Sequence, residues 1–192
     1  MHHTIRLSQM RIGVDLDGVV ADFTHGWTSQ YKKDFGKEIL EKDITEWGLS
    51  KPLTHFEEEI DFWNWAKDFN GSSIFRNLRT YDNAVEVLVE LSMEGHEIVI
   101  LSSKPWWSIH DTLIWLGEKK VPSKEIHFIE DKWNINCDVY IDDAPHQLEN
   151  FVKHVPEKLI LRFVRPYNRP VSGTKDLNDW MELSSLLESY NL

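Results

Sequence analysis

The stretch "RIGVDLDGVVADF", residues 11–23, places Asp15 and Asp17 directly after a short apolar run. Residues i and i+2 of an extended strand point to the same side, so the two carboxylates can face one space where that strand ends. Gly18 follows at once and allows the chain to turn sharply away. Two neighbouring carboxylates repel each other unless a cation joins them or one of them keeps a proton. The spacing therefore predicts either a metal site or an acid–base pair.

A second acidic pair, Asp142 and Asp143 in "DVYIDDAP", ends another apolar run. Ligands of open parallel sheets bind beyond the carboxyl ends of the strands, so we expect Asp143 to lie near Asp15. These carboxylates, with a main-chain carbonyl and waters, would form the oxygen-only site that Mg2+ prefers. The sequence therefore predicts Mg2+ as the cofactor.

Groups that could hold a phosphate follow two further apolar runs. Ser102 and Ser103 in "ILSSKP" offer hydroxyl and backbone N–H donors close to a helix start. Lys132 in "FIEDKW" offers a point charge for the phosphate and for a carboxylate beside it. An isolated DxD is more often a turn or a helix cap, and paired serines or one lysine say little alone. The ordered set, each part at the end of a predicted strand, is improbable by chance.

The elements that must position these residues are predicted from hydrophobic patterns. Five runs have strand length: "RIGV", "EIVIL", "IHFI", "DVYI" and "KLILRFV". Segments with helical spacing lie between or after them, at residues 83–95, 109–119, 144–154 and 177–190. This alternation predicts an α/β fold with a Rossmann-like parallel sheet of about five strands flanked by helices. The segment "RPYNRPVSGTKD", residues 165–176, is predicted to be a loop because of its proline and glycine residues.

Residues 23–81 separate the first predicted strand from the next helix, which is far more than a usual βα connection. This insert carries 12 of the 23 aromatic residues, and acidic runs such as "HFEEEIDF" favour amphipathic helices. We therefore expect a small helical cap over residues 23–81 and a core domain formed by residues 1–22 and 82–192. Most aromatic side chains of such a cap are expected to form its own core.

Composition limits the classes of function. The chain has 192 residues, of which 41% are hydrophobic, enough for one main core. Its net charge of −11 argues against a nucleic-acid polymer as partner. The lone Cys137 fits a reducing compartment and is expected to be a buried filler. The start "MHHTIRLSQM" lacks the apolar centre of a signal peptide and no run is long enough to span a bilayer, so a cytoplasmic location without a membrane partner is expected.

The ordered set of motifs resembles the haloacid dehalogenase-like phosphohydrolase superfamily over nearly the whole chain. Within it, "DLDGVVADF", "ILSSKP", "EDK", "YIDDAP" and "RPYN" are similar to the 5′(3′)-deoxyribonucleotidase family. The resemblance implies that Asp15 is the nucleophile that forms an aspartyl-phosphate. It implies that Asp17 protonates the leaving oxygen and later activates water, while Ser102 and Lys132 hold the phosphate.

The same resemblance implies the metal ligands and one substrate contact. Asp143 would bind Mg2+ directly, together with Asp15 and the backbone carbonyl of Asp17, while Asp142 supports the site from beside it. Phe23 stands where the "DGVxADF" pattern of the family carries an aromatic residue that contacts the base. A place in the core of the cap is an equally good interpretation of Phe23.

These features predict a Mg2+-dependent phosphatase that resembles 5′(3′)-deoxyribonucleotidases and acts on nucleoside monophosphates, small molecules rather than polymers. One alternative is a phosphatase for another small phosphate ester, since the insert does not specify a base. Another is a phosphate-binding module without catalysis, against which the intact Asp15 and Asp17 argue. The base, the sugar, the position of the phosphate and the oligomeric state, a homodimer included, stay open.

Overall fold

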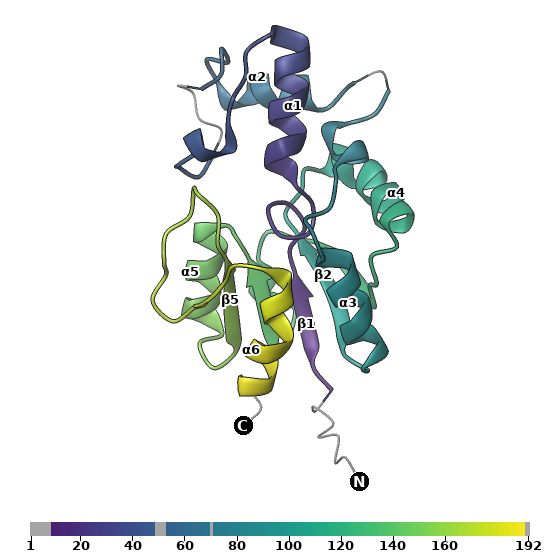
Figure 1. The fold of residues 1–192 in the computed structure, drawn as a ribbon, viewed down its shortest axis with the longest axis vertical. Coiled ribbons are helices and arrows are strands. Elements are labelled where there is room, and N and C mark those ends of the chain that lie inside the picture. Colours follow the sequence, from purple (N-terminus) through teal and green to yellow (C-terminus); the bar gives the residue numbers. More distant parts are fainter. Residues whose placement is uncertain (1–8, 49–52, 70, 191–192) are drawn as a thin grey trace.

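The computed structural model describes residues 9–48, 53–69 and 71–190. Its centre is a six-stranded sheet in the order β3-β2-β1-β4-β5-β6 (Figure 1). The strands are β1 (Arg11–Val14), β2 (Glu97–Ser102), β3 (Glu125–Phe128), β4 (Val139–Asp142), β5 (Leu159–Phe163) and β6 (Lys175–Leu177). Every pairing between neighbouring strands is parallel. The carboxyl ends of β2 and β4 therefore lie on either side of the end of β1.

Helices cover both faces of this sheet, and the burial of alternate strand residues shows why. In β2, Ile98 and Ile100 join one hydrophobic cluster, while Val99 and Leu101 join a second one. A strand buried on both sides needs such a continuous apolar run. The flanking helices are α3 (Ala84–Met93), α4 (Ile109–Lys119), α5 (Pro145–His154) and α6 (Leu183–Tyr190). The predicted α/β class with a parallel sheet flanked by helices is confirmed.

The predicted loop at residues 165–176 is wrong at its end, because β6 begins at Lys175 and pairs with β5. Hydrophobic periodicity does not reveal this strand, since Leu177 is its only buried residue. The polar partner of β6 lies on the neighbouring strand β5: the guanidinium of Arg162 donates to both carboxylate oxygens of Asp176, at 2.8 and 2.7 Å. The predicted helix at 177–190 consequently starts later, as a short 3-10 turn (Trp180–Glu182) followed by α6.

The insert forms a separate layer above the carboxyl edge of the sheet (Figure 1). It contains α1 (Phe23–Phe35), α2 (Glu59–Ala66) and two 3-10 turns, η1 (Glu41–Asp43) and η2 (Ile74–Asn77). Trp27 and Phe62 are almost fully buried and meet edge to face, with ring centroids 5.9 Å apart. Aromatic packing between α1 and α2 thus supplies a core for the insert.

The insert leaves and rejoins the rest of the chain at one place. Ala21 and Thr80 form an antiparallel bridge at its base. The N–H of Asp22 donates to the carbonyl of Arg79 at 2.9 Å, and the N–H of Tyr81 donates to the carbonyl of Val20 at 2.9 Å. Two adjacent chain segments therefore connect the two layers.

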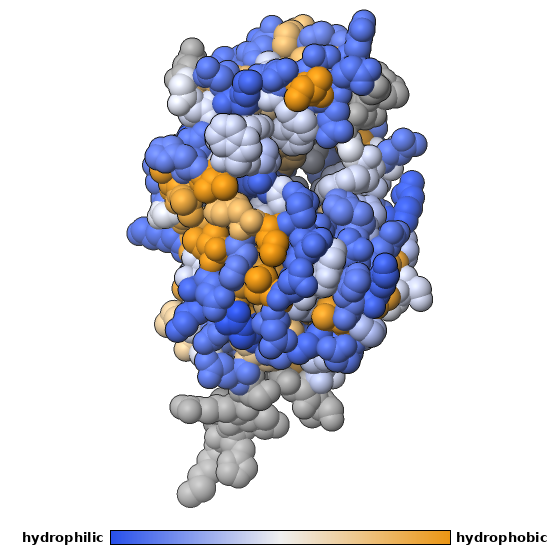
Figure 2. Space-filling view, turned by 180° about the vertical axis from the view of Figure 1, so that it is seen from behind, coloured by the Kyte–Doolittle hydropathy of each residue, from blue (hydrophilic) through white to orange (hydrophobic). Residues whose placement is uncertain are grey.

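The surface agrees with the acidic, charged composition. Seen from behind, the surface is mostly hydrophilic, with one main group of hydrophobic side chains on the layer that contains the sheet (Figure 2). No helix among the described residues is long and apolar enough to cross a membrane. Cys137 is buried, as predicted. Most of the N-terminal stretch used to predict targeting, residues 1–8, lies outside the described residues.

Candidate active site

The loop after β1 begins with Asp15, whose N–H donates to the carbonyl of Ile141 at 3.0 Å and so continues the sheet by one residue. Gly18 then adopts a φ of +81°, a conformation that side chains rarely allow. A Cβ atom at this position would also collide with the carboxylate of Asp143. Gly18 therefore lets the two acidic loops touch.

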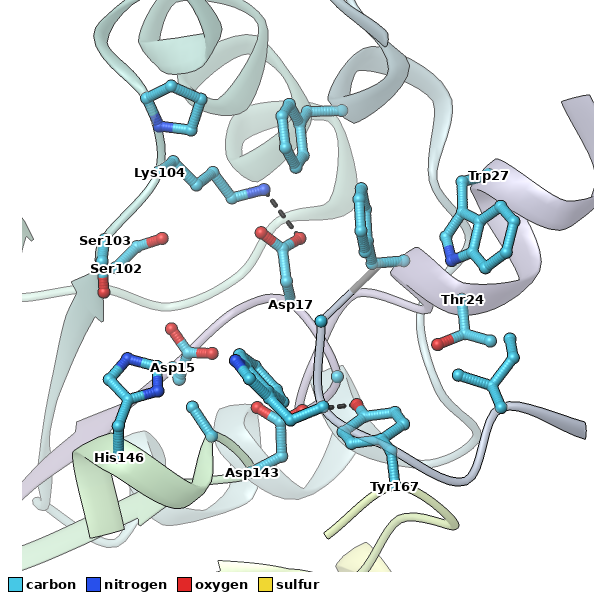
Figure 3. A pocket seen from close by; sticks show the side chains of 18 of the residues that line it. Asp15, Asp17, Thr24, Trp27, Ser102, Ser103, Lys104, Asp143, His146 and Tyr167 are labelled. Atoms are coloured by element: carbon cyan, nitrogen blue, oxygen red, sulfur yellow. Dashed lines mark hydrogen bonds and ion pairs between the residues drawn. The ribbon is translucent and has the colours of Figure 1, made fainter. Parts of the chain in front are cut away.

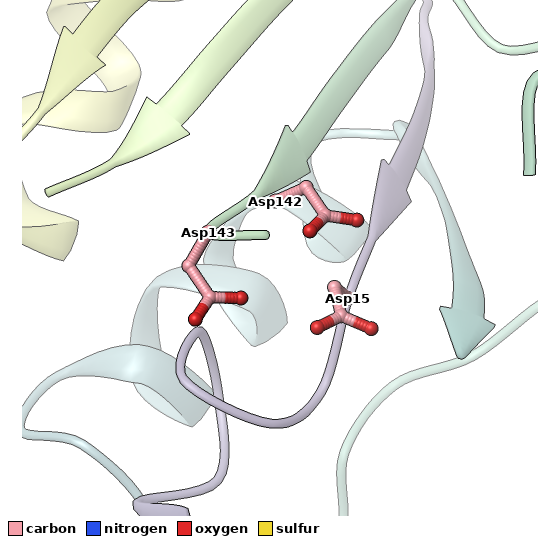
Figure 4. A group of neighbouring side chains, drawn as sticks. All are labelled: Asp15, Asp142 and Asp143. Atoms are coloured by element: carbon pink, nitrogen blue, oxygen red, sulfur yellow. The ribbon is translucent and has the colours of Figure 1, made fainter. Parts of the chain in front are cut away.

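Three buried carboxylates meet at this edge of the sheet (Figure 4). Asp15, Asp142 and Asp143 each place an oxygen within 4.8 Å of the others. Both oxygens of Asp142 have donors, Lys132 at 2.7 Å and the N–H of Ala144 at 2.9 Å. Asp142 is therefore a fixed neighbour of the other two carboxylates rather than a free ligand.

Asp143 differs from Asp142 in having one oxygen to spare. The hydroxyl of Tyr167 donates to its Oδ2 at 2.5 Å, while its buried Oδ1 meets no donor among the described residues. A buried carboxylate oxygen without a partner is costly unless a cation or donor reaches it. The donor set, oxygen atoms only and strongly negative, fits a hard divalent cation such as Mg2+.

Lys132 lies beneath these carboxylates and is not exposed to solvent. Its side chain is 2% exposed, and its ammonium donates to Asp15 Oδ1 at 2.8 Å and to Asp142 Oδ2 at 2.7 Å. Burial lowers the pKa of Lys132, but the charges of Asp142 and Asp15 outweigh this effect, so the net shift is upward and the group stays protonated. The predicted contact with a neighbouring carboxylate is confirmed, whereas the contact with phosphate stays a prediction.

Two carboxylates of the cluster, Asp15 and Asp143, have raised pKa values. Burial raises the pKa of Asp15 to about 6, opposed by Lys132 and reinforced by Asp142. Burial and the charges of Asp15 and Asp142 raise the pKa of Asp143 well above its usual range. Crowded negative charge therefore destabilises the fold when no cation is bound.

This crowding predicts how stability depends on pH in metal-free protein. Because the folded carboxylates bind protons more readily than unfolded ones, their contribution to the free energy of unfolding falls as pH rises from about 4 to above 6. Asp143→Asn removes one of these charges, so we expect it to raise the free energy of unfolding at pH 8 by about 1–3 kcal/mol. The gain should shrink at pH 5. Urea unfolding in chelator at both pH values measures it, and a variant less stable than wild type at pH 8 would contradict the account.

Asp17 points to a different partner, which the sequence did not reveal. Lys104 donates to Asp17 Oδ1 at 2.8 Å, and its ammonium lies 3.9 Å from the centre of the Phe75 ring (Figure 3). Burial raises the pKa of Asp17, Lys104 opposes the shift and Asp15 adds to it. The side chain of Asp17 is not part of the carboxylate cluster. Lys104 stands within the predicted "ILSSKP" motif, but nothing in the sequence separates it from any surface lysine.

A cavity of about 310 Å3 opens between the sheet edge and the insert (Figure 3). This volume is typical of a site for a small molecule. Six of the predicted site residues line it: Asp15, Asp17, Phe23, Ser102, Ser103 and Asp143. The two others, Lys132 and Asp142, are buried and are not among the described residues that line it. The lining also includes groups that sequence reasoning did not single out: Lys104, Glu130, His146 and Tyr167.

The insert gives the cavity a flat aromatic wall. Phe23 stacks on Phe75 with ring centroids 5.3 Å apart and an interplanar angle of 12°. It also stacks on Trp63 at 6.2 Å and 21°. All three side chains line the cavity and are also in contact with the core of the protein. Phe23 therefore fits both of its predicted interpretations, since it is packed on one side and faces the cavity on the other.

Aspartates after β1 and β4, a serine at the end of β2 and a buried lysine between the aspartates, all at one edge of this parallel sheet, define a haloacid dehalogenase-like phosphohydrolase. The fold agrees with a solved structure, the HAD family hydrolase from Deinococcus radiodurans R1 with bound phosphate and sodium. The TM-score is 0.64 at 14% identity, covering 97% of this chain and 98% of the other. The chain belongs to the family "5′ nucleotidase, deoxy (Pyrimidine), cytosolic type C protein", whose model matches residues 9–190.

Two relatives agree with that assignment over nearly their whole length. The chain is 26% identical to the 5′(3′)-deoxyribonucleotidase of Clostridium acetobutylicum, in an alignment that covers 95% of this chain and 97% of the relative. It is 26% identical to the 5′(3′)-deoxyribonucleotidase of Bacillus subtilis, in an alignment that covers 92% of this chain and 97% of the relative. The protein is thus a phosphoric monoester hydrolase of the 5′-nucleotidase type.

Proposed function

We propose that this protein is a Mg2+-dependent 5′(3′)-deoxyribonucleotidase that hydrolyses nucleoside monophosphates through an aspartyl-phosphate on Asp15. One observation carries the proposal: a single cavity joins the acidic, hydroxyl-bearing edge of the sheet to the aromatic wall of Phe23, Trp63 and Phe75. A phosphate requires the first surface, and a flat base matches the second. The names of the two relatives support the same substrate class.

The chemistry would begin with Asp15. Its carboxylate attacks phosphorus without prior deprotonation, so an oxygen–phosphorus bond forms as the ester bond breaks. Asp17 gives its proton to the leaving oxygen, and its raised pKa favours the protonated form that this step needs. In the second half of the reaction, water attacks the phosphorus of the aspartyl-phosphate while Asp17 takes a proton from that water. The bond between phosphorus and the Asp15 oxygen breaks, which releases phosphate and restores the Asp15 carboxylate.

The remaining site residues would position and neutralise the phosphate. Mg2+ would be held by Asp143, Asp15 and the backbone carbonyl of Asp17, with Asp142 beside them, and would neutralise charge on the transferring group. Ser102 and Ser103 line the cavity and would donate to phosphate oxygens.

Two lysines would add positive charge to the same end of the cavity. Lys132 holds Asp15 in place from behind. Lys104 would add a second positive charge from the cavity wall, next to Asp17. We also propose that residues 23–81 act as the substrate-selecting cap on a core of residues 1–22 and 82–192. The cytoplasmic location remains a prediction.

A comparison of substrates tests the proposal. We expect deoxynucleoside monophosphates to give higher kcat/KM values than sugar phosphates. Phe23→Ala should lower kcat/KM for nucleotides by about 10- to 100-fold, because base stacking on an aromatic ring is lost. Hydrolysis of glycerol phosphate, which has no base, should change little.

Phe35→Ala is the matched control for this comparison. Phe35 belongs to the same helix, α1, but is 44% exposed and is not among the described residues that line the cavity. We expect it to leave the preference for nucleotides unchanged. Equal or better turnover of sugar phosphates by wild type would instead favour a phosphatase for another small ester.

A further inference from the structure

A short segment after β5, residues 165–168, holds the two acidic loops together. Arg165 Nε donates to the carbonyl of Gly18 at 2.6 Å, in the loop after β1. The hydroxyl of Tyr167 donates to Asp143 Oδ2 at 2.5 Å, and Asn168 Nδ2 donates to the backbone carbonyl of Asp143 at 2.8 Å. One tight stretch of chain thus fixes the backbone of both loops and one carboxylate oxygen.

The segment is itself firmly anchored, so these contacts do not depend on a loose loop. The guanidinium of Arg165 lies 3.6 Å from the centre of the Tyr81 ring and 4.4 Å from that of Phe163. Asn168 Oδ1 accepts hydrogen bonds from Arg162 at 2.8 Å and from the N–H of Arg165 at 3.0 Å. Cation–π contacts and buried side-chain hydrogen bonds both reduce the freedom of such a segment.

The consequence for Asp143 is that its two oxygens are not equivalent. Oδ2 is held by Tyr167 and lies against Gly18, where a side chain would clash with both groups. Oδ1 is buried without a donor among the described residues. Asp143 offers one oxygen to the carboxylate cluster with Asp15. In Figure 4 one oxygen of Asp143 turns toward Asp15 and the other turns away from it.

We infer that Tyr167 is a positioning residue that reserves Oδ2 of Asp143, so that this carboxylate can offer a cation only one oxygen, and that it thereby favours Mg2+ over Ca2+. This inference rests on the proposed cation site. Ca2+ accepts six to eight oxygens and readily binds both oxygens of one carboxylate, whereas the smaller Mg2+ requires strict octahedral geometry. A carboxylate limited to one oxygen therefore suits Mg2+ better.

Calorimetric titration of metal-free protein with MgCl2 and with CaCl2, in the absence of substrate, tests the inference. Tyr167→Phe should weaken Mg2+ binding by about 10- to 100-fold, the usual effect of losing a hydrogen bond to a metal ligand. Ca2+ binding should weaken less or become tighter, so the Mg2+/Ca2+ preference should fall by about 10-fold or more. An unchanged preference in a folded Tyr167→Phe variant would overturn the inference.

Tyr140→Phe is the matched control, since it also removes a tyrosine hydroxyl that is hydrogen-bonded inside the protein. That hydroxyl accepts from the N–H of Cys137 at 3.1 Å and donates to the carbonyl of Ile135 at 2.7 Å, away from the carboxylates. The Mg2+/Ca2+ preference of Tyr140→Phe should equal that of wild type. A loss of preference as large as that of Tyr167→Phe would overturn the role of Tyr167 by showing a general effect of destabilisation.

Two further measurements keep the inference testable and separate it from the proposed function. Wild type should bind Mg2+ at least as tightly as Ca2+, whatever happens to the folding of the variants, and tighter Ca2+ binding would overturn the inference. Asp143→Asn should abolish binding of both ions. If Asp143→Asn still binds Mg2+ like wild type, the proposed cation site itself is wrong. If it loses Mg2+ while Tyr167→Phe keeps both affinities, only the role of Tyr167 is wrong.

Discussion

Asp15→Asn is expected to lower kcat by about 10,000-fold or more, the scale of loss seen when a covalent nucleophile is removed. An amide oxygen is a much weaker nucleophile than a carboxylate, and no other carboxylate of the cluster can replace Asp15. Asp142 is held by Lys132 and by the N–H of Ala144, and Asp143 follows a different strand. The reaction should therefore stop before the first phosphoryl transfer.

Steady-state turnover and acid quenching followed by mass spectrometry measure this loss. Quenched wild type should carry one phosphoryl group on the peptide that contains Asp15, and the variant should carry none. Asp22→Asn is the control from the same loop, since an asparagine can still cap α1 and Asp22 is not among the described lining residues. Full activity of sequence-verified Asp15→Asn would refute the covalent route.

Lys132→Met is expected to lower the free energy of unfolding by about 3–5 kcal/mol at pH 8 in metal-free protein. The substitution keeps an unbranched chain of similar length but removes the ammonium between Asp15 and Asp142. Two buried carboxylates then face each other without a cation. The deficit should be smaller at pH 5, because Asp15, whose pKa is already raised to about 6 and would rise further, becomes protonated there.

Urea unfolding in chelator at the two pH values tests this prediction, with Lys104→Met as the comparison. Lys104 also pairs with an aspartate, but the side chain of its partner Asp17 is 25% exposed, so water can solvate the carboxylate that is left. We expect a clearly smaller loss for Lys104→Met. Equal losses for the two variants would mean that the buried carboxylate pair is not what Lys132 stabilises.

The positions of the strands and of the acidic residues could be predicted because both follow from local sequence. An apolar run of strand length must be buried, and a polar residue directly after it must lie at the edge of the sheet. Asp15 and Asp143 come together for this reason. The parallel order of the strands then adds Ser102 without any further information.

The missed features depend on partners that are distant in the sequence. β6 pairs with β5 through its backbone and through the ion pair between Arg162 and Asp176, and it has only one buried residue, so its hydrophobic pattern does not reveal it. Lys104 acquires its place only when Asp17 and the insert's Phe75 reach it from other segments. Tyr167 belongs to the "RPYN" motif. Its contact with Asp143, however, follows from the path of the chain after β5 rather than from any local pattern.

The paired crossing at Ala21 and Thr80 bears on how this molecule could have diversified. Since the aromatic layer departs and returns through neighbouring residues, insertions, deletions and exchanges within it need not disturb the strand order beneath. Homologues could then differ in the metabolite that they accept while they inherit the same catalytic residues at the sheet edge.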